Sequence, residues 1–452
     1  MKNFLFFIPF FAFSATILIG QSNKNFEKPN VLIILTDDQG YYDVAACGAK
    51  DLVTPSMDNL FSDGMKFEYF YANCPVCSPT RASLLTGLYP DKAGVPGVIR
   101  THINNSWGFL DPSAITIADQ FKEGGYKTAI IGKWHLGLEK PNTPNERGFD
   151  YFHGYLGDMM DDYWTHRRHG VNYMRENEKE IDPEGHATDI FTKWAIDYIN
   201  IQSESSKPFF LYLAYNAPHS PIQPPEEWLE KVKKRAPDLN EKRANLVAFI
   251  EHLDHGIGQV INSLKQNNLY EKTLIVFTSD NGGQLRYAAN NGPLRDGKGS
   301  VYEGGLRVPT TIVWKNHISS GTVTNHKAIT MDLYPTLLEA AGIEVNHEID
   351  GISFLPVLYG EKTSDKDRVL YFTRREGGTS YGGLTIQAVQ LNEWKLLQNS
   401  PFESQELYNL QEDPFETINL IESESGQYRR LNNLMMKQLQ SAGKVPWQSP
   451  SK

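Results

Sequence analysis

Short apolar runs that end in polar clusters dominate the first three quarters of the chain. Residues 31–35, 128–131, 209–214 and 274–277 form four such runs, and stretches with helical periodicity lie between them. Continuous apolar strands that alternate with helices predict an α/β fold, with a large, mostly parallel sheet sandwiched by helices. The loops after the carboxyl ends of parallel strands meet at one edge of the sheet. We therefore expect the four polar clusters to be neighbours in space.

The pattern changes from about Gly342. Residues 369–373, 385–390 and 394–397 predict short strands separated by Gly, Asn and Ser, and residues 427–439 predict a helix. The C-terminal part therefore resembles a small antiparallel sheet with one helix.

The length of 452 residues exceeds what one compact core fills, which favours two domains. We expect a large domain over residues 28–342 and a small α+β domain over residues 343–452. The formal net charge of −10 argues against nucleic acid or an anionic membrane as a partner.

The N-terminus has the layout of a secretory signal peptide over residues 1–20. Lys2 precedes an apolar run over residues 4–19, and a polar stretch follows. A membrane anchor is the alternative, but a spanning helix needs about 20 apolar residues and the run is shorter. No cysteine lies near Gly20 to take a lipid. We expect a secreted or periplasmic protein without a membrane anchor.

The three cysteines, Cys47, Cys74 and Cys77, are too few for a disulfide scaffold. If chemistry consumes Cys77, the other two could form a disulfide or remain as buried thiols, and the sequence leaves both open. Residues 77–87 predict a turn that enters a helix, with Pro79 near its start and Gly87 at its end. Cys77 would then lie at the positive end of the helix dipole, which lowers a thiol pKa and attracts anions. A buried cysteine beside a helix cap is the simpler interpretation.

Hard oxygen ligands follow two of the predicted strands. Asp37 and Asp38 follow the first, and Asp280 and Asn281 follow the fourth. Either pair alone could be a turn sequence. Three carboxylates that converge at one sheet edge would repel without a cation, and their chemistry favours calcium or magnesium over zinc.

Two histidines follow strands at the same edge. His135 comes after the second strand and His219 after the third. Histidine transfers protons near neutral pH, although a single histidine is more often structural.

The segment Cys-x-Pro-x-Arg followed by Ala-Ser-Leu-Leu-Thr-Gly resembles the signature of the type I sulfatases, in which the cysteine is converted to formylglycine. The resemblance extends from about Lys28 to Leu439 and implies an alkaline phosphatase-like fold and hydrolysis of sulfate esters. It also takes in the segments 29–31, 132–137, 280–283, 294–309, 406–410 and 413–414.

The resemblance implies a role for each matching residue. The formylglycine at position 77 would be hydrated and attack sulfur, after conversion of the unfolded chain by a formylglycine-generating enzyme. One Ca²⁺ ion would be held by Asp37, Asp38, Cys77, Asp280 and Asn281. Arg81 would orient the formylglycine, Lys133 and Lys298 would bind sulfate, His135 would assist the diol, and His219 would protonate the leaving alcohol.

An aromatic and charged cluster predicts carbohydrate binding, although a solvated surface loop is the alternative. It comprises Trp164, His166, Arg167 and Arg168, with Arg100 and His102 as further candidates. The expected substrate is a sulfated polysaccharide, with algal glycans such as ulvan or carrageenan favoured over glycosaminoglycans. Two other functions stay open: a phosphoester or phosphonate monoester hydrolase, and a noncatalytic glycan-binding protein.

Overall fold

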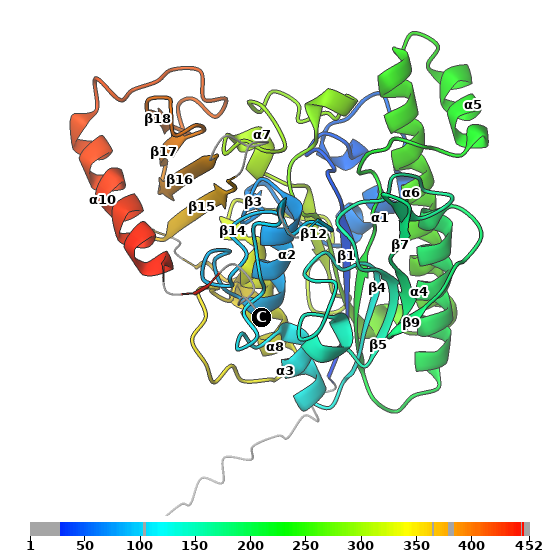
Figure 1. Ribbon diagram of the computed structural model, residues 1–452. Coiled ribbons are helices and arrows are strands. Elements are labelled where there is room, and N and C mark those ends of the chain that lie inside the picture. The colour runs from blue at the N-terminus through cyan, green and yellow to red at the C-terminus, as the bar shows by residue number, and fades with distance from the viewer. Residues whose placement is uncertain (1–27, 103–104, 364–365, 378–383, 444, 447–452) are drawn as a thin grey trace, which may run out of the picture.

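A large twisted sheet forms the centre of the protein (Figure 1). The computed structural model describes residues 28–102, 105–363, 366–377, 384–443 and 445–446. In spatial order the strands are β13 (Thr322–Thr324), β2 (Met65–Phe67), β12 (Thr310–Val313), β11 (Thr273–Ser279), β1 (Asn30–Thr36), β10 (Phe209–Ala214), β4 (Lys127–Lys133), β5 (Tyr151–Tyr155), β8 (Met174–Glu176) and β9 (Lys179–Glu180).

The middle of this sheet is parallel, as predicted, and its flanks are mixed. Strands β11, β1, β10, β4 and β5 run in parallel, whereas β12, β8 and β9 pair antiparallel to their neighbours. The register places Thr36 opposite Ser279 and Gly132 opposite Ala214. The four central strands therefore end nearly level, and the polar segments that follow them lie along one edge.

Every side chain of β1 is buried, because helices cover both faces of the sheet. Val31, Ile33 and Leu35 pack into one core cluster, and Leu32 and Ile34 into another. The first face carries α2 (Cys77–Thr86), α3 (Ile117–Glu123), α8 (Leu333–Ala340) and α9 (Leu355–Leu358). The second face carries α1 (Pro55–Asp63), α4 (Ala187–Ser203), α5 (Glu226–Arg235) and α6 (Glu241–Gln266). Figure 1 shows these two groups on opposite sides of the strands.

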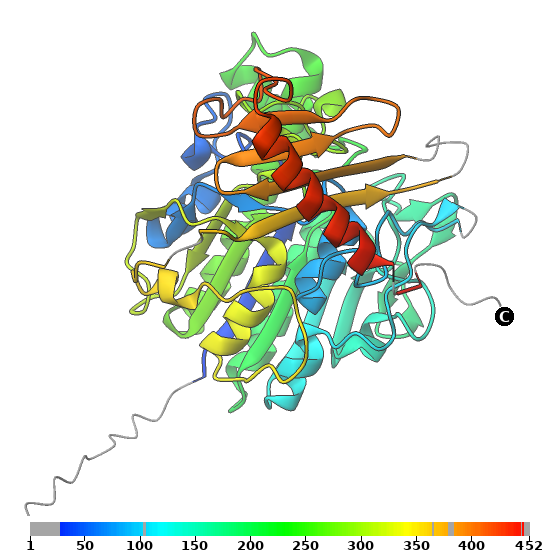
Figure 2. The same ribbon diagram turned by 90° about the vertical axis from the view of Figure 1, so that its left-hand side faces the viewer.

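The C-terminal part forms a second sheet with one helix across it (Figure 2). Its strands pair antiparallel in chain order: β15 (Val369–Arg375), β16 (Thr385–Leu391), β17 (Trp394–Gln398) and β18 (Glu406–Asn409). Helix α10 (Ser425–Ala442) packs on these strands. Two small ladders complete the described strands: β3 (Phe70–Tyr71) with β14 (Ala328–Ile329), and β6 (Arg167–Arg168) with β7 (Val171–Asn172). The predicted fold class is confirmed, while the predicted domain boundaries stay a prediction.

The predicted signal peptide lies outside the described residues. Among the residues that are described, no helix is long and apolar enough to cross a membrane.

A buried ion cluster ties the small sheet to the large domain. Lys395 of β17 is fully buried, and its ammonium group lies 2.9 Å from carboxylate oxygens of both Glu303 and Glu416. Glu303 begins the short helix α7 (Glu303–Leu306), and Tyr71 donates a hydrogen bond to it. Burial raises the pKa of Glu416 to about 7, against the attraction of Lys395.

Replacing Lys395 by Met should destabilise the protein by about 3–5 kcal/mol, because two buried carboxylates would lose their partner. Thermal or denaturant unfolding would measure the change. Lys437→Met, at an exposed position of α10, is the matched control and should change stability by about 0.5 kcal/mol or less. Equal stabilities of the two variants would contradict this account of the cluster.

Candidate active site

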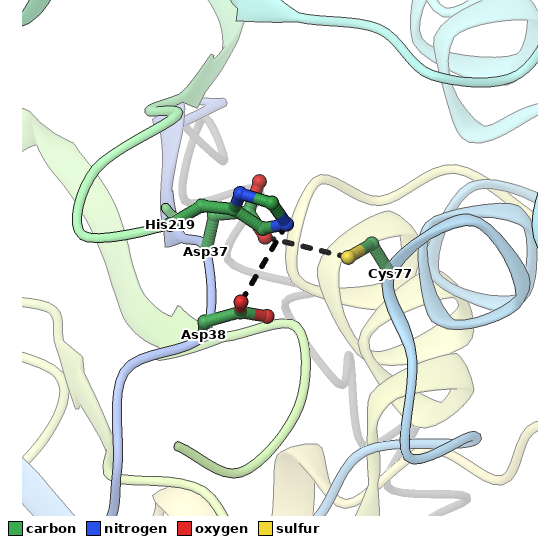
Figure 3. A group of neighbouring side chains, drawn as sticks. All are labelled: Asp37, Asp38, Cys77 and His219. Carbon is green, nitrogen blue, oxygen red and sulfur yellow. Dashed lines mark hydrogen bonds and ion pairs between the residues drawn. The ribbon is translucent and has the colours of Figure 1, made fainter. Parts of the chain in front are cut away.

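The expected polar clusters meet at the carboxyl edge of the central strands. Asp37 and Asp38 follow β1, His219 lies in the loop after β10, and Cys77 is the first residue of α2. Figure 3 shows these four side chains turned toward one another. Lys133 ends β4, and Asp280 directly follows β11.

Backbone contacts continue past the strands and fix the loops there. The N–H of Asp37 donates to the carbonyl of Ala217, and that of Asp280 donates to Thr36, both at 3.1 Å. Asp38 takes a left-handed conformation with φ of 66°, which aspartate tolerates better than most residues. Gly282 is also required, since a Cβ there would lie 1.9 Å from the carbonyl oxygen of Gly304. Little other backbone geometry or side-chain volume is therefore tolerated at Asp38 and Gly282.

Three cations neutralise the three buried carboxylates. Lys133 Nζ lies 2.5 Å from Asp37, Arg81 donates through Nε and Nη2 to Asp280, and Lys298 Nζ lies 2.7 Å from Asp38. These pairs bring Arg81, Lys133 and Lys298 together with the acidic cluster, as the sequence predicts.

Burial and neighbouring charges act on the carboxylates in opposite directions. Burial would raise the pKa of Asp37, but Lys133, His219 and Arg81 outweigh it and hold this pKa well below its usual range. Burial and the charge of Asp37 raise the pKa of Asp280 to about 7, against the effect of Arg81. The two acids therefore differ in how readily they lose a proton.

Cys77 is not the activated thiol that its helix position predicts. Its relative exposure is 3%, and burial together with Asp37 raises its pKa well above the usual value. The Sγ atom donates to Asp37 Oδ1 at 3.4 Å. The helix dipole is thus outweighed, and the thiol stays protonated. Cys47 and Cys74 are also free and buried, which answers the question of a disulfide between them.

Hydrogen bonds fix the tautomers of both histidines. His135 Nε2 donates to the carbonyl of Ile99, so its buried Nδ1 keeps a free lone pair. His219 Nδ1 donates to the carbonyl of Ser220, which leaves Nε2 facing Asp38 Oδ2 at 3.6 Å. Burial lowers the pKa of both rings, most strongly that of His135. In each ring one nitrogen is therefore engaged with a carbonyl, while Nδ1 of His135 and Nε2 of His219 remain for proton transfer.

The donor set fits a hard divalent cation. Ligand atoms of Asp37, Asp38, Cys77 and His219 lie within 4.8 Å of one another. Asn281 donates through Nδ2 to Asp38, while its buried Oδ1 has no hydrogen-bond partner. An unsatisfied amide oxygen beside converging carboxylates is suited to Ca²⁺ or Mg²⁺.

The chain that carries this site is similar to a known protein family. The sequence profile of the family described as "Sulfatase" matches residues 29–343. This chain belongs to the sulfatase family. The profile described as "N-sulphoglucosamine sulphohydrolase, C-terminal" matches residues 296–444. As a sulfatase, the protein is a sulfuric ester hydrolase.

Relatives cover most of this sulfatase. N-acetylgalactosamine-6-sulfatase of Canis lupus familiaris is 31% identical over 82% of this chain and 71% of its own length. A sulfatase of Formosa agariphila is 29% identical over 93% of this chain and 90% of its own. The crystal structure of Ps i-CgsB in complex with k-i-k-neocarrahexaose is 33% identical, with a TM-score of 0.85 over 93% of this chain and 95% of that one.

The residues that were predicted to bind substrate differ from one another in solvent exposure and in their contacts. Trp164 is 48% exposed, and the ring of His102 packs on His169 with centroids 4.6 Å apart. His166 is fully buried and donates through Nε2 to Gly185, so its ring faces the interior and not a ligand. The arginines form ion pairs: Arg100 with Glu376, Arg167 with Asp182, and Arg168 with Asp158 and Asp161.

Two features near the site were given no role of their own from the sequence. Tyr163, buried beside Trp164, donates from its hydroxyl to the carbonyls of Asn216 and His219. Arg374 lies in β15 and Glu376 directly follows this strand, and no motif marks either residue. The available signal was a charged run, 374–376, at the end of a predicted strand and before a Gly-Gly pair.

Proposed function

We propose that this sulfatase releases sulfate from a sulfated polysaccharide or its oligosaccharides, with a formylglycine made from Cys77 as the nucleophile and one bound Ca²⁺. The observation that carries the proposal is a protonated, buried thiol at the centre of the site. A thiol in this state is a poor nucleophile. The hydrate of an aldehyde at the same position attacks through oxygen and needs no thiolate.

The chain provides partners for each step of this reaction. One hydroxyl of the hydrated formylglycine attacks sulfur as the alcohol departs, and a covalent sulfate ester forms. The second hydroxyl then loses its proton, and the bond between carbon and the sulfate oxygen breaks, which restores the aldehyde. Splitting one difficult displacement into two steps is the advantage of nucleophilic catalysis. The free Nδ1 lone pair of His135 makes this ring the acceptor for the second proton.

Two lysines lie beside the position of the transferred group. Lys133 and Lys298 reach it from β4 and from the loop before α7, and Asp38 helps to raise the pKa of Lys298 above its usual value despite burial. Fixed cations aimed at developing negative charge lower the barrier of such transfers. A calcium ion held by Asp37, Asp38, Asp280 and Asn281 would add Lewis acidity toward the sulfate oxygens.

A carbohydrate substrate is supported by the rim of the site. Trp164 offers an exposed aromatic face, and the hydroxyl of its neighbour Tyr163 donates to the carbonyls of Asn216 and His219, which fixes Tyr163 beside the loop of His219. Aromatic faces with a polar edge suit the mixed apolar and polar faces of sugars. The similarity to a structure determined with a neocarrahexaose favours a carrageenan-type glycan over ulvan or a glycosaminoglycan.

Maturation before folding agrees with the burial of Cys77. A modifying enzyme cannot reach a side chain that is 3% exposed. We therefore propose that a formylglycine-generating enzyme acts on the unfolded chain, and that the apolar N-terminal run directs export.

Mass spectrometry of the peptide that contains Cys77, from cells able to make formylglycine, should show a loss of about 18 mass units relative to the thiol, as expected for conversion to an aldehyde. Sulfate release should be abolished in Cys77→Ala and retained in Cys47→Ala, the matched control. An unmodified thiol together with full activity would contradict the proposed nucleophile.

Calcium should raise the unfolding temperature of the protein, because a ligand that binds only the folded state stabilises it, by about 2.7 kcal/mol at a concentration 100 times its Kd. Differential scanning fluorimetry with and without calcium would measure the shift. The shift should vanish in Asp38→Asn and persist in Asp161→Asn, which changes an exposed acid. An equal shift in both variants would place the ion elsewhere.

Loss of His219 should affect sugar sulfates more than aryl sulfates, because a sugar alkoxide needs a proton to leave and a phenolate does not. His219→Ala should reduce kcat on a sugar sulfate by about 10²–10⁴-fold, the usual range for an acid–base group. The loss on 4-nitrophenyl sulfate should be much smaller. His255→Ala, on the exposed face of α6, serves as the control, and equal losses on both substrates would exclude the role.

A further inference from the structure

The loop that carries His219 depends on other segments of the chain for its conformation. Four prolines lie in this loop, which follows β10: Pro218, Pro221, Pro224 and Pro225. A proline has no backbone N–H to donate, so the loop has few donors for its own carbonyl groups. Buried carbonyl groups need a partner, and the donors must therefore come from elsewhere. Within the loop, the N–H of His219 donates to the carbonyl of Asn216 at 3.0 Å and closes the turn 216–219.

Tyr163 supplies a donor from another loop. Its hydroxyl lies 2.8 Å from the carbonyl oxygen of Asn216 and 2.9 Å from that of His219, so one group holds both ends of the turn 216–219. Burial raises the pKa of this hydroxyl well above its usual value, and it therefore stays protonated and continues to donate.

A second contact joins the same two loops. The side-chain amide of Gln223 accepts from the N–H of Tyr163 at 2.8 Å and donates to Asp162 at 3.0 Å. The carbonyl of Gln223 accepts from Nε2 of His186, on which the ring of Tyr163 stacks. The loop of His219 is therefore held at its beginning by the hydroxyl of Tyr163 and at its end by the contacts of Gln223.

The position of the His219 ring follows that of its loop. Nδ1 donates to the carbonyl of Ser220, which belongs to the same loop. Nε2 lies 3.6 Å from Asp38 Oδ2, which is beyond hydrogen-bond distance. Both observations leave the loop backbone, and hence its outside contacts, to set where Nε2 points.

We propose that Tyr163 is a positioning residue for the leaving-group acid: by fixing the turn 216–219, it places Nε2 of His219 where a departing alcohol takes its proton. The inference rests on the proposed function and adds a residue to it. Tyr163 is 1% exposed, so it acts through His219 and not on the substrate itself. Trp164 is the next residue, and the same segment thus carries both an exposed aromatic face and the hydroxyl that holds the acid.

The first test removes only the hydroxyl, in Tyr163→Phe. This variant should lower kcat on a sugar sulfate by about 10- to 100-fold with little change in KM, because displacing a catalytic geometry by about 1 Å costs this much. On 4-nitrophenyl sulfate kcat should change by less than about 2-fold, since a phenolate leaves without help from an acid. Equal losses on the two substrates would show a merely structural role and overturn the proposal, as would unchanged rates on both.

Tyr126→Phe is the matched control. The Tyr126 hydroxyl also donates to a backbone carbonyl, that of Pro29 at 2.9 Å, and the residue is 3% exposed. It directly precedes β4 and therefore lies at the opposite edge of the sheet from the site. Both variants should unfold at a lower temperature than the unmutated protein, but Tyr126→Phe should keep the same ratio of rates on the two substrates. A changed ratio in Tyr126→Phe would overturn the assignment to Tyr163.

The second test uses a series of sulfate esters whose leaving groups differ in pKa. The decrease in kcat with rising leaving-group pKa should be steeper in Tyr163→Phe than in the unmutated enzyme, and it should be steeper again in His219→Ala. The double variant should behave as His219→Ala alone, because the hydroxyl has nothing to position once the acid is gone. Additive losses would overturn the proposal. Failure of the unmutated enzyme to release sulfate from any ester would instead count against the proposed function.

Discussion

The burial of three carboxylates at one sheet edge is the constraint on which the rest of the site depends. A lone buried carboxylate costs several kcal/mol, so each acid needs a cation from another element. Arg81 therefore connects α2 to the end of β11, Lys133 connects β4 to the end of β1, and Lys298 brings a distant loop onto the same edge. The ion pairs fix Cys77 in place by fixing the start of its helix.

The C-terminal sheet helps to position one of these cations. The segment that carries Lys298 is held from the small sheet at several points. Arg295 donates to the Tyr408 hydroxyl and to the carbonyl of Glu416, and the N–H of Val301 donates to Asn399. Lys395 then pairs with Glu303 immediately after this segment. Because these contacts surround Lys298 in the sequence, the small sheet sets the position of a cation of the large domain.

The features that depend only on strand order and on the ends of strands could be predicted from the sequence. Because β1 and β11 are parallel neighbours, Asp37 and Asp280 lie close together whatever the conformation of the loops that follow. The acidic cluster could therefore be predicted. The pKa of Cys77 could not, because it reflects a balance between the helix dipole and complete burial beside Asp37. The inward orientation of the His166 side chain could not be predicted either, because a histidine in a polar run can donate to a buried carbonyl such as that of Gly185. Arg374 and Glu376 depend on how the two sheets are joined, which local patterns do not encode.

The charges of the protein groups at the site are balanced. Asp37, Asp38 and Asp280 are balanced by Arg81, Lys133 and Lys298, so the protein groups alone provide no excess positive charge for an incoming sulfate. The two lysines can turn to the substrate only if another positive charge takes their place beside Asp37 and Asp38. The free Oδ1 of Asn281 lies next to these acids and offers a ligand that neither lysine uses. A divalent ion would therefore change the site from a neutral cluster, in which a thiol stays protonated, to a cationic one that attracts a sulfate ester.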